Sequence, residues 1–347
     1  MSQDENLTNK KLGELWENQE TPVLDTIGNK YIIFSDMHLG DGRGADDFHE
    51  NEETFLKALD FYKENGYELI LMGDIEELWQ FPLNQITGRY NDSVYRKLRA
   101  FGDDHVYRVY GNHDSDWCQL DDPAKNNPIE NKYAIEALKM RDSQGNIRIL
   151  LAHGHQGSTE SDKHSWSSRF WVRLFRKVEP FAKKLGFTRH PSVTKSRIAK
   201  DYERILYSWA KKNRVMLVCG HSHRAIFSSK SYAERLKEKI AELQNEILKN
   251  RSDKELIERN RKEIKRLHKE FLEEKRKKRL IESAEPDGKS KPCYFNSGCG
   301  LYSDGVTGIE IADDTIKLVK WHRGVPEESE FEIYEEGNLS EYIAEVV

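Results

Sequence analysis

Short apolar runs recur along the chain, and several of them stop at a cluster of polar residues and glycine. Five such runs begin at Tyr31, Tyr67, His105, Ile147 and Val215. Their length and their content of β-branched residues favour buried strands over helices. Each predicted strand delivers Asp, Asn or His at its carboxyl end, which is where ligand sites gather in α/β sheets.

Helical spacing of apolar residues separates the first three predicted strands, at 52–64 and 93–101. This alternation of strand and helix predicts an α/β fold. Further strands are predicted after residue 292, and the last two of them are joined by a turn at Asp313 and Asp314. The final stretch, 327–347, is acidic and weakly patterned.

A first insertion, 158–213, combines basic residues with apolar residues three or four positions apart between Trp166 and Leu185. The pattern predicts an amphipathic basic helix, a loop at His190-Pro191 and a second helix. Its place between two of the polar clusters suits a helical lid. Helices packed on the core with a solvated basic face, or a contact with a membrane surface, are the alternatives.

A second insertion, 230–283, is almost continuously charged and carries apolar residues at heptad spacing. The pattern breaks at 250–254, which predicts a protruding antiparallel helical hairpin, with one long helix as the alternative. Over 230–282 there are 18 Lys and Arg against 12 Asp and Glu, an excess of six positive charges. Such a projection suits nucleic acid or an acidic partner, whereas simple solvation or self-association would explain it equally well.

Composition limits the class of protein. The chain has 347 residues, 37% hydrophobic and 33% charged, with a net charge of -5, so it has no global field that attracts nucleic acid or anionic membrane. No apolar signal segment or membrane span is visible, and the four cysteines form no CxxC pair, so a cytoplasmic protein is expected. The expected divisions are a polar N-terminal segment at 1–29, a core at 30–229, the hairpin at 230–283 and closing strands with an acidic tail at 284–347.

The polar clusters form an ordered set of motifs: DMH at Asp36, GDIEE at Gly73, GNHD at Gly111, HGH at His153 and GHSH at Gly220. Each cluster alone is weak evidence for a metal site, but five clusters in this order, each after a predicted strand, form a specific pattern. The set resembles the calcineurin-like metallophosphoesterase superfamily from about Tyr31 to His223. The resemblance implies a four-layer αββα sandwich with a dinuclear metal site between two sheets.

The resemblance also implies roles for individual residues. One metal would be held by Asp36, His38 and His223, and the other by Asn112, His153 and His221. Asp74 would bridge both metals. His113 would be the acid or phosphate-contacting residue, oriented by Asp114. Glu76 or Glu77 is expected to orient a ligand histidine from behind.

These residue types suit the chemistry. Carboxylate and imidazole ligands favour borderline divalent ions, with manganese as the first choice and iron, zinc or nickel as alternatives. Two such ions can share a hydroxide that attacks phosphorus, while His113 donates a proton or stabilises charge. Arg43, in the loop after the first motif, and His155, the second histidine of HGH, are candidate substrate contacts. A solvated loop arginine is the competing interpretation for Arg43, and a metal ligand or a plain surface histidine for His155.

The expected function is hydrolysis of a phosphoric ester, with a diester or pyrophosphate bond favoured because the predicted lid carries apolar residues. The GDIEELW stretch also resembles UDP-diacylglucosamine hydrolases, which act on a lipid-linked substrate. The chain differs from them in having His113 where those enzymes usually carry arginine. A nuclease that holds DNA or RNA on the hairpin, and a non-catalytic metal-binding scaffold, are the alternative functions.

Overall fold

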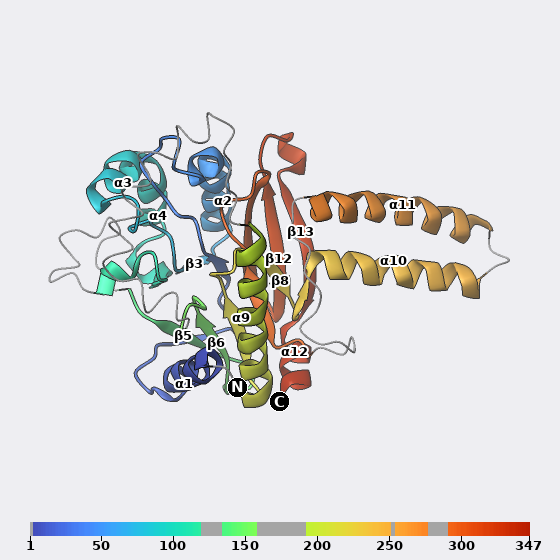
Figure 1. Ribbon diagram of the computed structural model, residues 1–347, viewed down its shortest axis with the longest axis horizontal. Coiled ribbons are helices and arrows are strands. Elements are labelled where there is room, and N and C mark those ends of the chain that lie inside the picture. The colour runs from blue at the N-terminus through green and yellow to red at the C-terminus, as the bar shows by residue number, and fades with distance from the viewer. Residues whose placement is uncertain (1–2, 119–133, 158–191, 251–253, 277–290) are drawn as a thin grey trace.

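Two β-sheets face each other and are covered by helices on their outer sides (Figure 1). The computed structural model describes residues 3–118, 134–157, 192–250, 254–276 and 291–347. The predicted α/β sandwich is therefore confirmed, and the five strands expected before the polar clusters are all present. Within the described residues, no helix is long and apolar enough to cross a membrane.

The first sheet supplies three of the polar clusters. Its six strands lie in the order β13-β12-β11-β2-β3-β4, where β2, β3 and β4 are parallel and the others antiparallel. Their bounds are β2 (Tyr31–Phe34), β3 (Glu68–Met72), β4 (Val106–Val109), β11 (Gly305–Ala312), β12 (Thr315–His322) and β13 (Phe331–Asn338). The expected turn between β11 and β12 is confirmed, because Asp313 and Asp314 take the left-handed conformation that two-residue hairpins require.

The second sheet supplies the other two clusters. Its seven strands lie in the order β1-β5-β6-β7-β10-β8-β9, with β6, β7 and β10 parallel. Their bounds are β1 (Val23–Asp25), β5 (Ala137–Arg141), β6 (Ile147–Ala152), β7 (Met216–Cys219), β8 (Ala225–Phe227), β9 (Lys230–Ser231) and β10 (Tyr294–Ser297). Because β6 and β7 are parallel, the residues that follow them meet at one edge of the sheet.

Three apolar layers hold the sandwich together. The inner faces of the two sheets pack on each other through residues such as Ile33, Val109, Leu151 and Val218. The outer helices complete the layers. Their bounds are α1 (Gln3–Glu17), α2 (Glu52–Glu64), α3 (Leu83–Tyr90), α4 (Arg96–Arg99), α9 (Ser192–Asn213) and α12 (Leu339–Val346), with single turns η1 (Phe48–Asn51), η3 (Asp103–His105), η4 (Ser115–Cys118) and η5 (Glu327–Ser329) and a π-turn η2 (Asn91–Tyr95).

Both ends of the chain take part in the fold, which the sequence pattern did not indicate. The N-terminal segment forms α1, which lies beside α9 and buries Leu12 against the outer face of the second sheet (Figure 1). The acidic C-terminal stretch forms β13 and α12, and α12 buries Leu339 and Ile343 against the inner core. The helical spacing is present, in Leu12, Leu15 and Trp16 and in Leu339, Tyr342, Ile343 and Val346, but it covers only one or two turns of each helix.

The charged insertion forms two helices, α10 (Tyr232–Lys249) and α11 (Lys254–Arg276), which project away from the sheets side by side (Figure 1). Leu236, Ile240 and Leu267 are buried between them. In the first insertion, only α9 at 192–213 is described. The basic aromatic segment from Trp166 to Lys184, where a lid is predicted, lies outside the described residues.

We expect Leu12→Ala to lower the free energy of unfolding by about 2–5 kcal/mol, because Leu12 is fully buried in the layer that α1 shares with α9. Lys10→Ala on the same helix, whose side chain is 72% exposed, should change it by less than about 0.5 kcal/mol. Urea unfolding followed by circular dichroism measures both. Equal, small effects would show that α1 does not belong to the cooperative fold.

Candidate metal centre

The seven predicted ligands lie on loops that leave the carboxyl ends of five strands. Asp36 and His38 follow β2, Asp74 follows β3 and Asn112 follows β4. The other sheet contributes His153 after β6 and the pair His221 and His223 after β7. Since parallel strands end at a common edge, the two sheets bring these side chains together from opposite sides.

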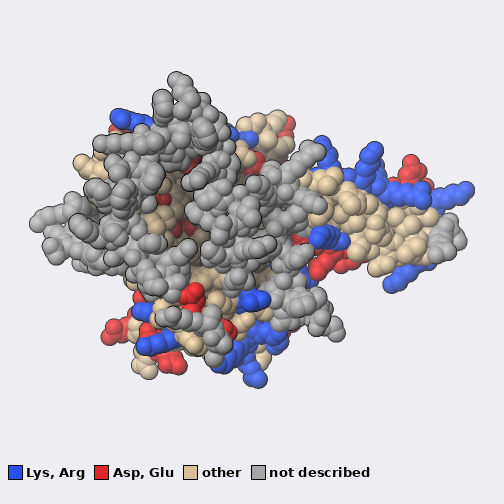
Figure 2. All heavy atoms as spheres, in the orientation of Figure 1, with Lys and Arg blue, Asp and Glu red and all other residues tan. Residues whose placement is uncertain are grey.

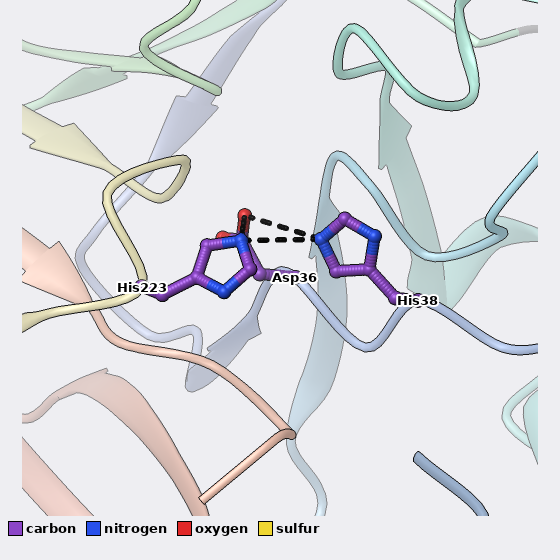
Figure 3. Close-up of side chains that lie close together, drawn as sticks. All are labelled: Asp36, His38 and His223. Atoms are coloured by element: carbon purple, nitrogen blue, oxygen red, sulfur yellow. Dashed lines mark hydrogen bonds and ion pairs between the residues drawn. The ribbon is translucent and has the colours of Figure 1, made fainter. Parts of the chain in front are cut away.

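Three groups of donor atoms result among the described residues, and in each group one atom per residue lies within 4.8 Å of the others. Two of them consist of predicted ligands: Asp36, His38 and His223 in the first, and Asp74, His153 and His221 in the second. The third is His38, Glu77 and His113. Figure 3 shows the first group, in which Nε2 of His38 and Nε2 of His223 approach to 3.2 Å beside the Asp36 carboxylate. The first group has the three residues that the resemblance assigns to one metal, and the second joins Asp74 to two of the three residues that it assigns to the other.

Asp74 lies between the two groups. Its Oδ2 is 3.1 Å from Nε2 of His153 and 3.8 Å from Nε2 of His38. Its Oδ1 accepts a hydrogen bond from the backbone N–H of His113 at 2.8 Å. The two oxygens of Asp36 have the same division of roles, because its Oδ2 accepts a hydrogen bond from the backbone N–H of His221 at 2.8 Å. Each carboxylate thus anchors a neighbouring loop with one oxygen and directs the other into the cluster.

The residues present fit a metal ion. Buried side-chain atoms normally have a hydrogen-bond partner, and an exception requires an explanation. Asp36 Oδ1, Asn112 Oδ1 and His153 Nε2 are buried and make no hydrogen bond of good geometry within the described structure, although Asp74 Oδ2 lies 3.1 Å from His153 Nε2. All three belong to predicted ligands, and all are atom types that bind divalent cations. Cations bound in this cluster would satisfy such atoms.

The backbone around the cluster is strained, as functional sites often are. Ten non-glycine residues of the described chain have positive φ, and five of them are predicted ligands: Asp36, His38, Asp74, His221 and His223. Close approach also requires glycine. A Cβ on Gly111 would lie 2.2 Å from Asp74 Oδ1, and one on Gly73 would lie 2.4 Å from His153 Nδ1. Packing energy elsewhere in the sandwich must therefore hold these loops in place.

Hydrogen bonds at Nδ1 leave Nε2 of two histidines available to a metal. His38 Nδ1 lies 2.9 Å from Glu77 Oε2, and His153 Nδ1 lies 2.9 Å from the carbonyl oxygen of Met72. In both cases the ring donates its Nδ1–H, which fixes the tautomer and the orientation of the ring.

Glu77 also holds His113. His113 Nδ1 lies 2.8 Å from Glu77 Oε1, so one carboxylate connects a predicted ligand and the predicted acid. The indole of Trp79 stacks on the His113 ring, with centroids 4.0 Å apart and an interplanar angle of 22°. Of the two glutamates considered from the sequence, Glu77 is thus the one that contacts histidines. Glu77 belongs to the site because it contacts two histidines and its carboxylate is buried.

Asp114 has a different place from the one expected. Its carboxylate accepts hydrogen bonds from two backbone N–H groups, those of Ile75 at 2.9 Å and Gly111 at 2.6 Å, rather than from the His113 ring. It therefore joins the loop that carries Asp74 to the loop that carries Asn112. The ring of His113 is oriented by Glu77 and Trp79 instead.

A buried ionic network stands behind these loops. Arg108 on β4 is fully buried, pairs with Glu76, lies 3.8 Å from Asp114 and covers the ring of Trp117. The Tyr95 hydroxyl and the Trp117 indole N–H also donate to Glu76. The sequence signal for this network is an arginine within an otherwise apolar strand, which motif matching passes over.

Helix α9 is connected to both loops of the second sheet. The Tyr202 hydroxyl donates to the carbonyl oxygen of Gln156, and the Tyr202 ring lies 5.9 Å from that of His221. The next residue, Glu203, pairs with Arg224, which follows His223. The helix that ends the first insertion thereby braces the loops that carry His153, His221 and His223.

The two candidate substrate contacts differ in their surroundings. His155 lies 5.5 Å from the ring of His153, and its Nδ1 is buried and without a partner in the described structure, so it is not a plain surface histidine. Arg43 is exposed on a loop. That loop is shaped by the buried carboxylate of Asp46, which accepts the backbone N–H groups of Gly40 and Gly42.

The charges of the cluster divide its histidines into two kinds. Burial disfavours protonation of His38, but Glu77, Asp74 and Asp36 outweigh it and raise its pKa to about 9. Burial is likewise outweighed at His153, whose pKa Asp74 and Asp36 raise to about 10. Burial lowers the pKa of His223 to about 4 despite Asp36. Without metal, two protons therefore balance the carboxylates, and a bound cation would displace them.

Comparison with known proteins agrees with this geometry. The model of the calcineurin-like phosphoesterase family matches residues 30–225, more than half of the chain, and the protein belongs to that family. It is accordingly a metal-dependent hydrolase of phosphoric esters. No curated protein matches the chain. A matching solved structure is a conserved uncharacterized protein of Streptococcus pneumoniae TIGR4, described as a predicted phosphoesterase. It is 12% identical over 84% of this chain and 87% of its own, and its TM-score of 0.28 is too low to support an argument.

We expect Glu77→Gln to weaken metal binding by roughly 10- to 100-fold and to lower kcat, because a neutral amide cannot accept from both His38 and His113. Titration with Mn²⁺ and hydrolysis of a nitrophenyl ester at saturating metal separate the two effects. Glu53→Gln, at a side chain that is 85% exposed, is the control and should change neither. Unchanged affinity and unchanged kcat in Glu77→Gln would contradict the positioning role.

Proposed function

We propose that the protein is a dinuclear hydrolase that cleaves a phosphodiester or pyrophosphate bond in a small-molecule or lipid-linked substrate. The observation that carries this proposal is the position of Asp74 between two groups of donor atoms. Two divalent ions, with manganese as the first choice, would supply a water of lowered pKa and neutralise charge on the phosphoryl oxygens. Water, rather than a side chain, is the proposed nucleophile.

The proposed division of ligands is the one that the family resemblance implies. Asp36, His38 and His223 would hold one ion, and Asn112, His153 and His221 the other. Asp74 would serve both: its Oδ2 lies 3.1 Å from His153 Nε2 and 3.8 Å from His38 Nε2, whereas Oδ1 of Asp36 lies nearest to His223, at 3.3 Å. The carboxylates and the buried Asn112 oxygen are hard donors, and the imidazoles are borderline donors. This mixture suits Mn²⁺ or Fe²⁺ and does not resemble a cysteine-rich structural zinc site.

His113 is the proposed general acid. With Nδ1–H donated to Glu77, the opposite nitrogen, Nε2, is the one that can pass a proton to the leaving-group oxygen. The ring is 22% exposed, so it is reachable by substrate, while Trp79 covers one of its faces. Glu77 keeps the ring in one orientation.

The proposed bond type rests on the sequence of the first insertion. Its apolar residues suit a substrate that carries an organic group on each side of the phosphorus, as a diester or pyrophosphate does. The test is a screen with added Mn²⁺ of p-nitrophenyl phosphate, bis-p-nitrophenyl phosphate and a nucleoside diphosphate sugar. We expect kcat/KM for the diester or the pyrophosphate to exceed that for the monoester at least about tenfold. A preference for the monoester would overturn the proposed bond type while leaving the family assignment intact.

Two substitutions test the proposed roles. Asp74→Asn should lower the content of both metals together, because a single carboxylate serves both groups. His113→Ala should keep normal metal content and lower kcat by roughly 100-fold or more, because it removes proton donation. Metal analysis of the purified variants, with kcat measured on the same samples, distinguishes them. Two metals per chain in Asp74→Asn would sink the bridging assignment.

A further inference from the structure

The two broad sides of the α10–α11 hairpin differ in charge. The seam between the helices includes Leu236, Ile240, Leu243, Asn260, Ile264, Leu267 and Phe271. Successive residues of a helix are rotated by about 100°, so residues that follow a seam position lie on one side and residues that precede one lie on the other. In an antiparallel pair, the following residues of both helices share the same side.

The side formed by preceding residues is balanced and ion-paired. It carries Arg235, Lys239, Glu242, Glu246, Arg259, Glu263, Arg266 and Glu270, four basic and four acidic residues. Arg266 lies 2.7 Å from Glu263 and 2.5 Å from Glu270, and Lys239 lies 3.8 Å from Glu242. We call it the mixed face. Its charges largely satisfy one another.

The other side, the cationic face, is defined by Lys237, Arg261 and Lys265, which directly follow Leu236, Asn260 and Ile264; Lys269 continues their row toward the outer edge of α11, and all four are exposed. Between Lys237 and Leu248, α10 adds no acidic residue to this side, and the acidic residue of α11 there, Glu258, lies nearer the tip. Among the described residues, no ion pair involves any of the four. Figure 2 shows Lys and Arg gathered along the α11 edge of the hairpin, beside a largely uncharged surface.

The cations of α11 form a row. Arg261, Lys265 and Lys269 are four residues apart, so they succeed one another about every 6 Å along the helix, over about 12 Å in all, and each step turns about 40° around it. One strand of a nucleic-acid duplex places a phosphate about every 3.4 Å along the helix axis, so the row matches three to four phosphates. Lys237 joins the row at its base, where its Nζ lies 5.5 Å from the centroid of Phe271.

The surroundings of the row favour a duplex over other anionic partners. Single-strand binding uses exposed aromatic side chains, and Phe271 belongs to the seam instead. Adsorption to a membrane requires a broad apolar face, whereas the exposed large apolar residues here, Leu248 and Leu272, lie at opposite ends of the hairpin. We propose that the cationic face binds the phosphate backbone of double-stranded nucleic acid, without reading its bases.

Binding of this kind depends steeply on salt. Each neutralised phosphate contributes a slope of about -0.9 to the dependence of log K on log salt. Three to four contacts therefore predict a slope of roughly -3. The contacts lie on α10 and α11 and need no metal, so the proposal is independent of the function proposed for the metal centre.

The test measures binding of the full chain, in EDTA, to labelled 20-base-pair duplexes by fluorescence anisotropy. One duplex is DNA and the other is RNA, so the measurement shows which of them the chain prefers. Arg261→Gln, Lys265→Gln and Lys269→Gln combined should weaken binding of the preferred duplex roughly 100-fold at low salt and remove most of the slope. The matched control combines Lys239→Gln, Arg259→Gln and Arg266→Gln, all on the mixed face. It removes three charges from the same hairpin and should change affinity less than about threefold.

Equal losses in the two triple variants would overturn the proposal, because net charge rather than the row would then carry the binding. Absence of duplex binding by the wild-type chain, tighter binding of a single strand, or a preference for phosphatidylserine vesicles would also overturn it. Hydrolysis of a nitrophenyl ester with Mn²⁺ is measured on all three proteins. Unchanged hydrolysis in the triple variants shows that a loss of binding does not come from a failure to fold.

Discussion

The carboxylates of Asp36 and Asp74 lie within 4 Å of the same imidazole nitrogen, Nε2 of His153, in the buried space between two sheets. Burying such charges without compensation costs several kcal/mol. Backbone N–H groups occupy one oxygen of each carboxylate, and histidines and the unpartnered atoms surround the other. The demand for a cation at this place explains the choice of residues around it. It also explains why five ligands tolerate positive φ.

The metal centre depends on supports in the layers behind it. Glu77 aligns His38 and His113, while Asp114 joins two loops through their backbone and is itself approached by the buried Arg108. On the second sheet, Tyr202 and Glu203 connect α9 to the remaining loops. Packing of the hydrophobic sandwich therefore holds the strained loops of the site in place. Loss of packing in an outer helix would displace the ligands.

The hairpin follows a different rule. It buries only a narrow seam and contributes little to the sandwich, so its surface is not constrained by the core. The difference between its two faces is therefore informative: among the described residues, five of the eight charged side chains of the mixed face pair with one another, whereas no ion pair involves the cations of the other side. The chain would then combine a phosphoesterase core with a separate projection that binds anions.

The sequence by itself determined the strands of the core, the order of the polar clusters and the identity of the candidate ligands. It could do so because buried strands are apolar runs and each ligand directly follows one. It did not reveal α1 or the folded C-terminal stretch, because the helical spacing of apolar residues in each covers only one or two turns and becomes decisive only against the surface that it covers.

Only the tertiary structure decided which residues support the ligands. Glu76 and Glu77 are equivalent in the sequence, yet one pairs with Arg108 and the other with two histidines. Asp114 adjoins His113 in the chain but points to backbone N–H groups instead. The physical reason is that these contacts join residues about 30 to 40 positions apart, and their direction is set by how two sheets pack, which no local pattern encodes.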